Sequence, residues 1–303
     1  MSKNKLKPIT NKSTIGIIAP ASPESPEFID EKIDLFSKLG FKIKKGKYLY
    51  DNTGYLAGDD RNRATDLNFM FADTDVDAIV SFRGGYGSIR IMPYLDLKTI
   101  KKNPKMFFGY SDITLLLNYI SSKCNFPTFH GPMINSDFTD IYTREYFLKV
   151  LLSNKNKLTY DLNDVCAYDY IIKNNKDFSG KIVGGNLSII CSSIGTPYEI
   201  KLENNIILIE DVNESPYVVD RMLSQLLSCG KLQKSSAIIV GDFTNCVGSK
   251  SSPSINEVIN ERLSILKQPI IYGFKLGHDY PNISIPIGSV FKYLSKDKIL
   301  IEK

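Results

Sequence analysis

The stretch KMFFGYSDITLLL, residues 105–117, joins a short apolar strand to an apolar helix through an abrupt turn that contains Ser111. A hydroxyl at this place extends from the end of a buried strand and lies at a helix N-terminus, where N–H groups and the helix dipole favour negative charge. That geometry suits a nucleophile whose attack creates an oxyanion. The match to the nucleophile elbow G-x-S-x-G is partial, because Ile113 replaces the second glycine. Taken alone, the stretch favours Ser111 as a simple helix N-cap.

Strand and helix patterns alternate on both sides of this turn. Before it, strands are expected at residues 14–19, 41–43, 76–82 and 106–108, and helices at residues 25–39 and 59–71, with Ser25-Pro26 and Asp59 as their start signals. After it, strands are expected at residues 205–210, 237–240 and 269–274, helices at 218–228 and 255–266, a glycine-containing turn region at 181–188, and short β segments near the end. This alternation predicts an α/β protein built of parallel βαβ units.

Residues 137–177 break the alternation, since they are rich in Asn, Asp, Lys and Tyr and contain one expected helix at residues 143–152. We therefore expect an N-terminal domain at residues 1–136, an inter-domain connection at 137–177 and a C-terminal domain at 178–303.

Composition narrows the classes of function. The 303 residues carry a net charge of +5 from scattered lysines, which argues against nucleic-acid binding. Residues 1–10 do not resemble a secretory signal, and no apolar run is long enough to cross a membrane. Five dispersed cysteines without a C-x-x-C motif indicate a reduced, cytoplasmic protein. With only two histidines we expect no metal site, and we expect no cofactor.

Three chemically capable side chains follow predicted strands: Ser111, Glu210 and His278. In open α/β sheets, ligands bind at the carboxyl ends of the strands, so these three side chains are candidates for a catalytic triad. In such a triad His278 takes the serine proton and Glu210 stabilises the imidazolium. The residues alone leave alternatives open, because the acid could also be any of the nearby carboxylates, Asp211, Glu214 and Asp220.

The loop RGGYGS, residues 83–88, also follows a predicted strand. Its glycines would let backbone N–H groups approach a substrate oxygen, as in an oxyanion hole, although a plain tight turn or a phosphate cradle fits as well. Arg83 is a candidate ligand for a substrate carboxylate. The other histidine, His130, has no acid nearby in the sequence, and we expect it to be structural.

Seven segments together resemble the LD-carboxypeptidase family of serine peptidases, which includes murein tetrapeptide carboxypeptidases and microcin C immunity peptidases. They are GIIAPAS at 16–22, RGGYG at 83–87, GYSDIT at 109–114, HGPM at 130–133, GGNL at 184–187, EDV to DRML between 210 and 223, and GH at 277–278. They occur in the family's order and span nearly the whole chain.

The resemblance implies a Ser–Glu–His triad at Ser111, Glu210 and His278. It implies an oxyanion hole from the backbone N–H of Asp112 and of Gly84 or Gly85. It also implies two domains, a parallel-sheet α/β domain with the serine and a smaller, swivelling β/α domain with the acid and the histidine, and an active site at their interface.

The implied reaction is release of the C-terminal D-Ala from murein tetrapeptide or a muropeptide, in cell-wall recycling, by a cytoplasmic homodimer. The alternatives are cleavage of an amide in a peptidyl-nucleotide toxin, as in microcin C immunity, and a non-catalytic binding protein. The immunity peptidases tend to carry a tryptophan that stacks on the nucleotide, and this chain has none.

Overall fold

The computed structural model describes residues 6–153, 157–167 and 169–303, which form two compact units. Unit 1 comprises residues 6–153 and Ser284–Gly288, and unit 2 comprises Lys157–Ile283 and Ser289–Lys303 without residue 168. Each unit has its own sheet, so the predicted α/β class with two sheets is confirmed. Among the described residues, none of the helices combines the length and apolar character that a membrane span needs.

Unit 1 has a six-stranded sheet with the order β12-β5-β4-β3-β1-β2. Its strands are β1 (Thr14–Ile18), β2 (Lys42–Lys45), β3 (Ala78–Ser81), β4 (Met106–Gly109), β5 (Thr128–His130) and β12 (Ile285–Ile287). Strands β1 to β5 are parallel, and β12 is antiparallel to β5. The carboxyl ends of the central strands therefore lie at one edge of the sheet, and β4 delivers Ser111 to that edge.

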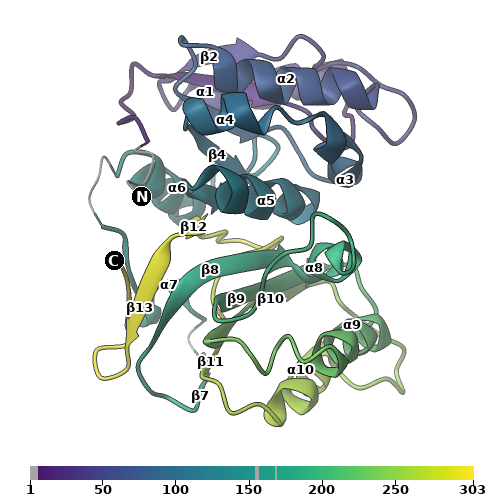
Figure 1. Cartoon of the computed structure of the whole chain (residues 1–303), viewed down its shortest axis with the longest axis vertical. Coiled ribbons are helices and arrows are strands. Elements are labelled where there is room, and N and C mark those ends of the chain that lie inside the picture. Colours follow the sequence, from purple (N-terminus) through teal and green to yellow (C-terminus); the bar gives the residue numbers. More distant parts are fainter. Residues whose placement is uncertain (1–5, 154–156, 168) are drawn as a thin grey trace. The chain divides into compact units, whose positions relative to one another are not determined.

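Helices cover the unit 1 sheet (Figure 1). They are α1 (Pro26–Ser37), α2 (Asp60–Ala72), α3 (Ser88–Ile91), α4 (Leu97–Lys102), α5 (Thr114–Cys124) and α6 (Ile141–Leu151), with 3₁₀ turns η1 (Met92–Tyr94) and η2 (Ser111–Ile113). Two start signals are confirmed: the Ser25 side chain accepts from Phe28 N–H, and the Asp59 side chain accepts from Arg61 N–H.

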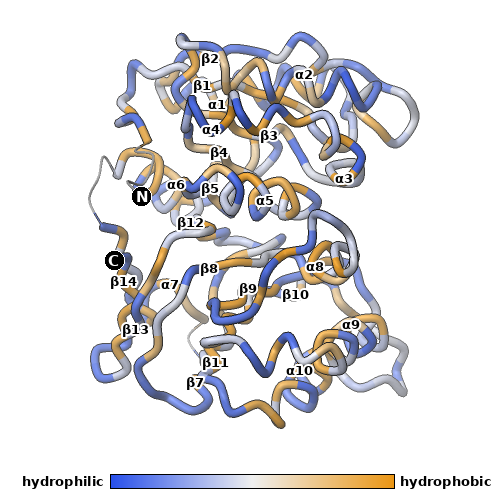
Figure 2. Tube along the Cα trace, in the orientation of Figure 1, coloured by the Kyte–Doolittle hydropathy of each residue, from blue (hydrophilic) through white to orange (hydrophobic). Residues whose placement is uncertain are grey.

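Unit 2 has an eight-stranded sheet with the order β6-β14-β13-β8-β9-β10-β11-β7. Its elements are β6 (Thr159–Asp161), α7 (Leu162–Val165), β7 (Ile172–Lys173), β8 (Phe178–Asn186), α8 (Leu187–Ser193), β9 (Ile206–Val212), α9 (Pro216–Ser228), β10 (Ala237–Thr244), α10 (Ile255–Ser264), β11 (Ile270–Tyr272), β13 (Val290–Leu294) and β14 (Ile299–Glu302). Strands β8 to β11 are parallel neighbours, as βαβ units require. Figure 2 shows hydrophobic residues in β9 and β10, the central parallel strands of this sheet.

The expected turn region at residues 181–188 is wrong. Residues up to Asn186 belong to β8, which pairs with β9 and β13 in the middle of the sheet. Glycine normally weakens a strand. Because this segment has three glycines in nine residues, its sequence pattern favoured a turn. Burial between two neighbouring strands outweighs that local preference.

Residues 137–177, expected as an inter-domain connection, carry regular structure of their own. Helix α6 belongs to unit 1, whereas β6, α7 and β7 belong to unit 2. Strand β12, placed in the C-terminal domain by the sequence, pairs with β5 in unit 1, where Ser121 Oγ donates to Ile287 O at 3.1 Å. The domain boundaries at 136 and 178 remain predictions.

Candidate active site

Ser111 has a backbone conformation that L-residues seldom adopt, with φ +60°, and it lies two residues after the end of strand β4. Such a left-handed residue costs about 1–2 kcal/mol, and this strain is typical of functional turns. Ser111 is not a helix N-cap: Tyr110 and Ile113 hold the cap positions of η2 and α5, and neither makes a side-chain cap bond. The simple capping role is therefore wrong, and the positive φ between a strand and a helix is a feature that this turn shares with nucleophile elbows.

The glycine loop, residues 83–88, packs directly against this turn. A Cβ atom added to Gly84 would lie 2.9 Å from Ser111 Cβ and 3.1 Å from Ser111 Oγ. Gly85 has φ +108°, and a Cβ there would overlap the Ser22 side chain. The loop therefore needs glycine both for close approach and for its backbone angle.

Three backbone N–H groups near Ser111 donate to no acceptor among the described residues: those of Gly84, Gly85 and Asp112. A Cβ on Gly84 would lie 3.3 Å from Asp112 N, so Gly84 and the Asp112 amide are close neighbours. Amides without a protein acceptor beside a hydroxyl form the arrangement that stabilises an oxyanion.

Arg83 already has a carboxylate partner, because its Nη1 lies 2.6 Å from Glu24 Oε2. Its side chain is one-third exposed. His130 is fully buried in β5, in keeping with the structural role expected for it. No cluster of metal-ligating side chains occurs in the part of the chain that the structure describes.

In unit 2, Glu210 and His278 form a close pair, with 2.7 Å between Glu210 Oε2 and His278 Nδ1. Glu210 lies near the carboxyl end of β9 and is fully buried, and the His278 side chain is 15% exposed. The two ring nitrogens lie on opposite sides of the imidazole, so Nε2 points away from Glu210. A histidine oriented in this way is suited to act as a general base through Nε2.

Burial raises the pKa of the Glu210 carboxyl, and the hydrogen bond from His278 opposes that rise. Gly277 makes the close approach possible: its φ is +130°, and a Cβ there would lie 3.0 Å from Glu210 Oε2. The loop after β11 therefore brings His278 onto a carboxylate that is 68 residues away in the chain.

The alternative acids have other partners. Asp211 accepts from Asn186 Nδ2 at 2.9 Å and from Ser188 N at 2.9 Å, and so holds the start of α8. Asp220 pairs with Arg262 at 3.3 Å. Glu210 is thus the carboxylate that contacts His278. The bond from Asn186 to Asp211 forms because β8 and β9 are neighbouring strands, which the sequence analysis did not predict.

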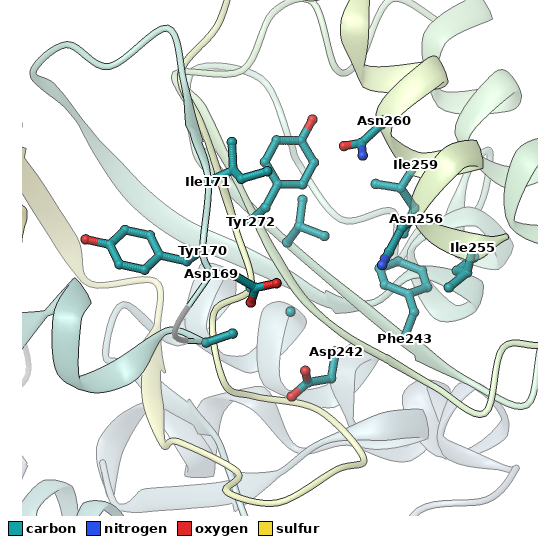
Figure 3. Close-up of a pocket in the computed structure, with 14 residues that line it drawn as sticks. Asp169, Tyr170, Ile171, Asp242, Phe243, Ile255, Asn256, Ile259, Asn260 and Tyr272 are labelled. Atoms are coloured by element: carbon teal, nitrogen blue, oxygen red, sulfur yellow. The ribbon is translucent and has the colours of Figure 1, made fainter.

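A cavity of about 390 Å³ opens in unit 2 between β10, β11 and α10 (Figure 3). In Figure 3, Asn256 and Asn260 extend from α10 towards the cavity, with Asp242 at its other side. Asp242, which lines this cavity, contacts the loop that carries His278: its backbone N–H donates to Leu276 O at 2.9 Å. Burial raises the pKa of Asp242 to about 6, partly opposed by Lys275.

Comparison with known families supports this reading of the two units. Residues 15–131 match the model of the LD-carboxypeptidase N-terminal domain, and residues 179–292 match the model of the C-terminal domain. A probable murein peptide carboxypeptidase of Bacillus subtilis is 39% identical over 94% of this chain and 90% of its own length. The microcin C7 self-immunity protein MccF of Escherichia coli is 31% identical over 93% of this chain and 90% of its own length.

Solved structures agree. MccF in complex with glutamyl sulfamoyl guanosine has a TM-score of 0.89 at 26% identity, covering 98% of both chains. A muramoyltetrapeptide carboxypeptidase from Oxalobacter formigenes has a TM-score of 0.82 at 26% identity, covering 96% of this chain and 98% of its own. Because both domain models match in order and relatives align along nearly their whole length, this chain belongs to the LD-carboxypeptidase family and is an enzyme of that class.

Proposed function

We propose that this enzyme releases the C-terminal D-Ala of murein tetrapeptide by hydrolysing its L,D amide bond, in peptidoglycan recycling. The observation that carries the proposal is the buried Glu210–His278 pair at 2.7 Å, an acid–base pair that a serine nucleophile requires. The 39%-identical relative named as a probable murein peptide carboxypeptidase supports the choice of substrate.

In the proposed mechanism, Ser111 Oγ attacks the carbonyl carbon of the L,D bond while His278 Nε2 takes its proton. Glu210 holds the imidazole in the required tautomer and stabilises the imidazolium. The Asp112 amide and that of Gly84 or Gly85 bind the oxyanion. His278 then protonates the departing amine of D-Ala, and water hydrolyses the acyl-enzyme. We propose Ser111, Glu210 and His278 as one triad, contributed by both units.

The substrate ends in a free carboxylate, which calls for a cation near the leaving group. We propose Arg83 for this role, with the substrate carboxylate taking the place of Glu24 on the guanidinium. An arginine is suited to such an exchange because its planar fork binds carboxylates in two-point contacts.

The test is incubation of the purified protein with murein tetrapeptides that carry L-Lys or meso-diaminopimelate at the third position, with D-Ala release as the readout. We expect D-Ala release from at least one peptide, and a loss of at least about 10,000-fold in Ser111→Ala, because the nucleophile and its base act as a unit. Failure to release D-Ala from either peptide, or a fully active Ser111→Ala protein, would contradict the proposal. A processed microcin-type peptidyl-nucleotide tests the alternative substrate in the same assay.

We further propose that the enzyme acts in the cytoplasm as a homodimer. All five cysteines are free thiols, which suits a reducing compartment. Cell fractionation tests the location. Light scattering coupled to size exclusion tests the assembly, and a mass of one chain, near 34.1 kDa, would contradict the dimer.

A further inference from the structure

A buried arginine forms hydrogen bonds that hold the glycine loop of unit 1 in place. Arg63, in α2, is 1% exposed. Its Nη1 donates to Pro20 O at 2.6 Å and to Gly87 O at 3.0 Å, and its Nη2 pairs with Asp60. A Cβ added to Gly87 would lie 2.7 Å from Arg63 Nη1, so the loop has no side chain where the guanidinium reaches it.

Two other side chains fix the rest of the loop. Asp112, which is 4% exposed, accepts from Ser88 N at 2.8 Å through Oδ2. Ser22 accepts from Tyr86 N at 3.0 Å through Oγ, and its own N–H donates to Gly84 O at 3.2 Å. These contacts engage the carbonyls and the outer amides of the loop. They leave the amides of Gly84 and Gly85 without a protein acceptor among the described residues.

Burying this arginine costs free energy, because the charged guanidinium loses its contacts with water. Burial lowers the pKa of Arg63, with Asp60 opposing the change, although the guanidinium stays charged at any ordinary pH. Buried ion pairs often contribute little net stability, and some persist because they fix one arrangement of the chain. Here the fixed arrangement includes the carbonyl of Gly87, only a few residues from the Gly84 and Gly85 amides.

We propose that Arg63 is a positioning residue for the oxyanion hole: it holds the glycine loop so that the Gly84 and Gly85 amides face the oxyanion formed at Ser111. The Asp112 carboxylate is the second anchor, tying the loop to the same turn that carries Ser111. This inference rests on the proposed serine mechanism. Preorganised donors act only when they are held in place before the reaction, so an unfastened loop weakens binding of the transition state more than binding of the substrate.

The experiment compares Arg63→Met with Arg90→Met. Arg90 contacts the same carboxylate, with its Nε 3.0 Å from Asp60 Oδ2, but its side chain is 41% exposed and bonds to no loop residue among those the structure describes. Its backbone N–H donates to Gly87 O at 3.1 Å, and a change of side chain leaves that bond in place. We expect Arg63→Met to lower kcat by about 10- to 100-fold with KM within threefold, in the range of losing part of an oxyanion contact. Arg90→Met should stay within twofold of the wild type.

Two measurements separate a positioning role from a merely structural one. Affinity for a peptide phosphonate, which mimics the tetrahedral intermediate, should fall by the same factor as kcat. Affinity for the substrate, measured in the Ser111→Ala background, should not change. Arg63→Lys should recover part of the lost activity, because its ammonium can donate to both carbonyls, and it provides the same measurements if Arg63→Met does not fold.

An unchanged kcat in folded Arg63→Met would overturn the inference, and so would an unchanged kcat in Arg63→Lys where Arg63→Met does not fold. So would a lower kcat with unchanged phosphonate affinity, or an equal loss of substrate affinity in the Ser111→Ala background. The rate at which a fluorophosphonate labels Ser111 needs no peptide substrate. A slower rate in Arg63→Met alone supports the inference even if murein peptides are not cleaved, and failure of the murein assay then counts against the proposed substrate only.

Discussion

Unit 1 and unit 2 contribute different kinds of chemical group to the proposed site. In unit 1 the important groups belong to the backbone: the positive φ of Ser111, the bare Cα of Gly84, and amides without a protein acceptor. In unit 2 they are side chains, the carboxylate of Glu210 and the imidazole of His278 at 2.7 Å. The nucleophile side thus depends on conformation, and the acid–base side depends on buried charge.

This difference decides how each unit should respond to mutation. A site that uses backbone groups tolerates most side-chain substitutions. The exception is a glycine whose replacement would place a Cβ atom against a neighbouring residue. A site built from a buried carboxylate tolerates no loss of charge, because His278 loses the group that stabilises its protonated form. The predictions below test these two sensitivities, beginning with the larger.

Glu210→Gln should reduce kcat by about 1,000-fold or more, because the neutral amide neither stabilises the imidazolium nor fixes the tautomer. The fold should be retained, since the two side chains have nearly the same shape. The control is Asp220→Asn, which changes an acid of the same unit that pairs with Arg262. Steady-state kinetics on murein tetrapeptide give the answer, and near-normal turnover by Glu210→Gln would remove it from the proposed triad.

Gly84→Ala should reduce kcat/KM by about 100-fold, the order of loss expected when reacting groups are displaced by roughly 1 Å. Its methyl group would lie 2.9 Å from Ser111 Cβ, so the loop or the serine must move. Gly84 does not have a positive φ, so the effect is steric.

The matched control for Gly84→Ala is Gly180→Ala in β8, where the nearest atom to the added Cβ lies 3.2 Å away and the proposed site is not touched. We expect that variant to keep its kcat/KM. Equal kinetics for the two variants would mean that the approach of Gly84 to Ser111 has no bearing on the reaction.

Glu199→Gln should change stability and leave kcat/KM unchanged. Glu199 lies 2.7 Å from Lys231, and this hydrogen bond, followed by one from Gly195 N–H, lowers its pKa to about 2. A carboxyl with a folded pKa below its unfolded value stabilises the protein above about pH 4.5, and this contribution is lost as the pH falls towards 2. We expect a loss of about 1–2 kcal/mol in the free energy of unfolding at pH 7, reduced for partial solvent screening.

Urea denaturation of wild type and Glu199→Gln at several pH values measures this effect, and the difference should shrink steadily below pH 4.5. Glu203→Gln is the control, because Glu203 and its partner Lys234 are both more than half exposed and we expect no measurable change. A constant difference down to pH 2 would show that the carboxylate charge is not what stabilises unit 2 at this place.

Local signals predicted most of the regular elements. The apolar run at residues 205–210 became β9, and the Ser25-Pro26 pair opened α1, because burial of apolar residues and capping depend on near neighbours in the chain. Local signals failed at residues 181–188, where three glycines in β8 are held in a strand by its partners β9 and β13. They also failed at β12, whose pairing with β5 joins residues more than 150 positions apart.

The sequence established the α/β class, the family and the candidate residues, because these depend on residue type, periodicity and order along the chain. Tertiary structure decided which carboxylate contacts His278, which strand completes the sheet of unit 1, and that Arg63 fastens the glycine loop. Those outcomes depend on contacts between distant segments and on the cost of burying charge. Neither can be inferred from the few residues that precede and follow a position in the sequence.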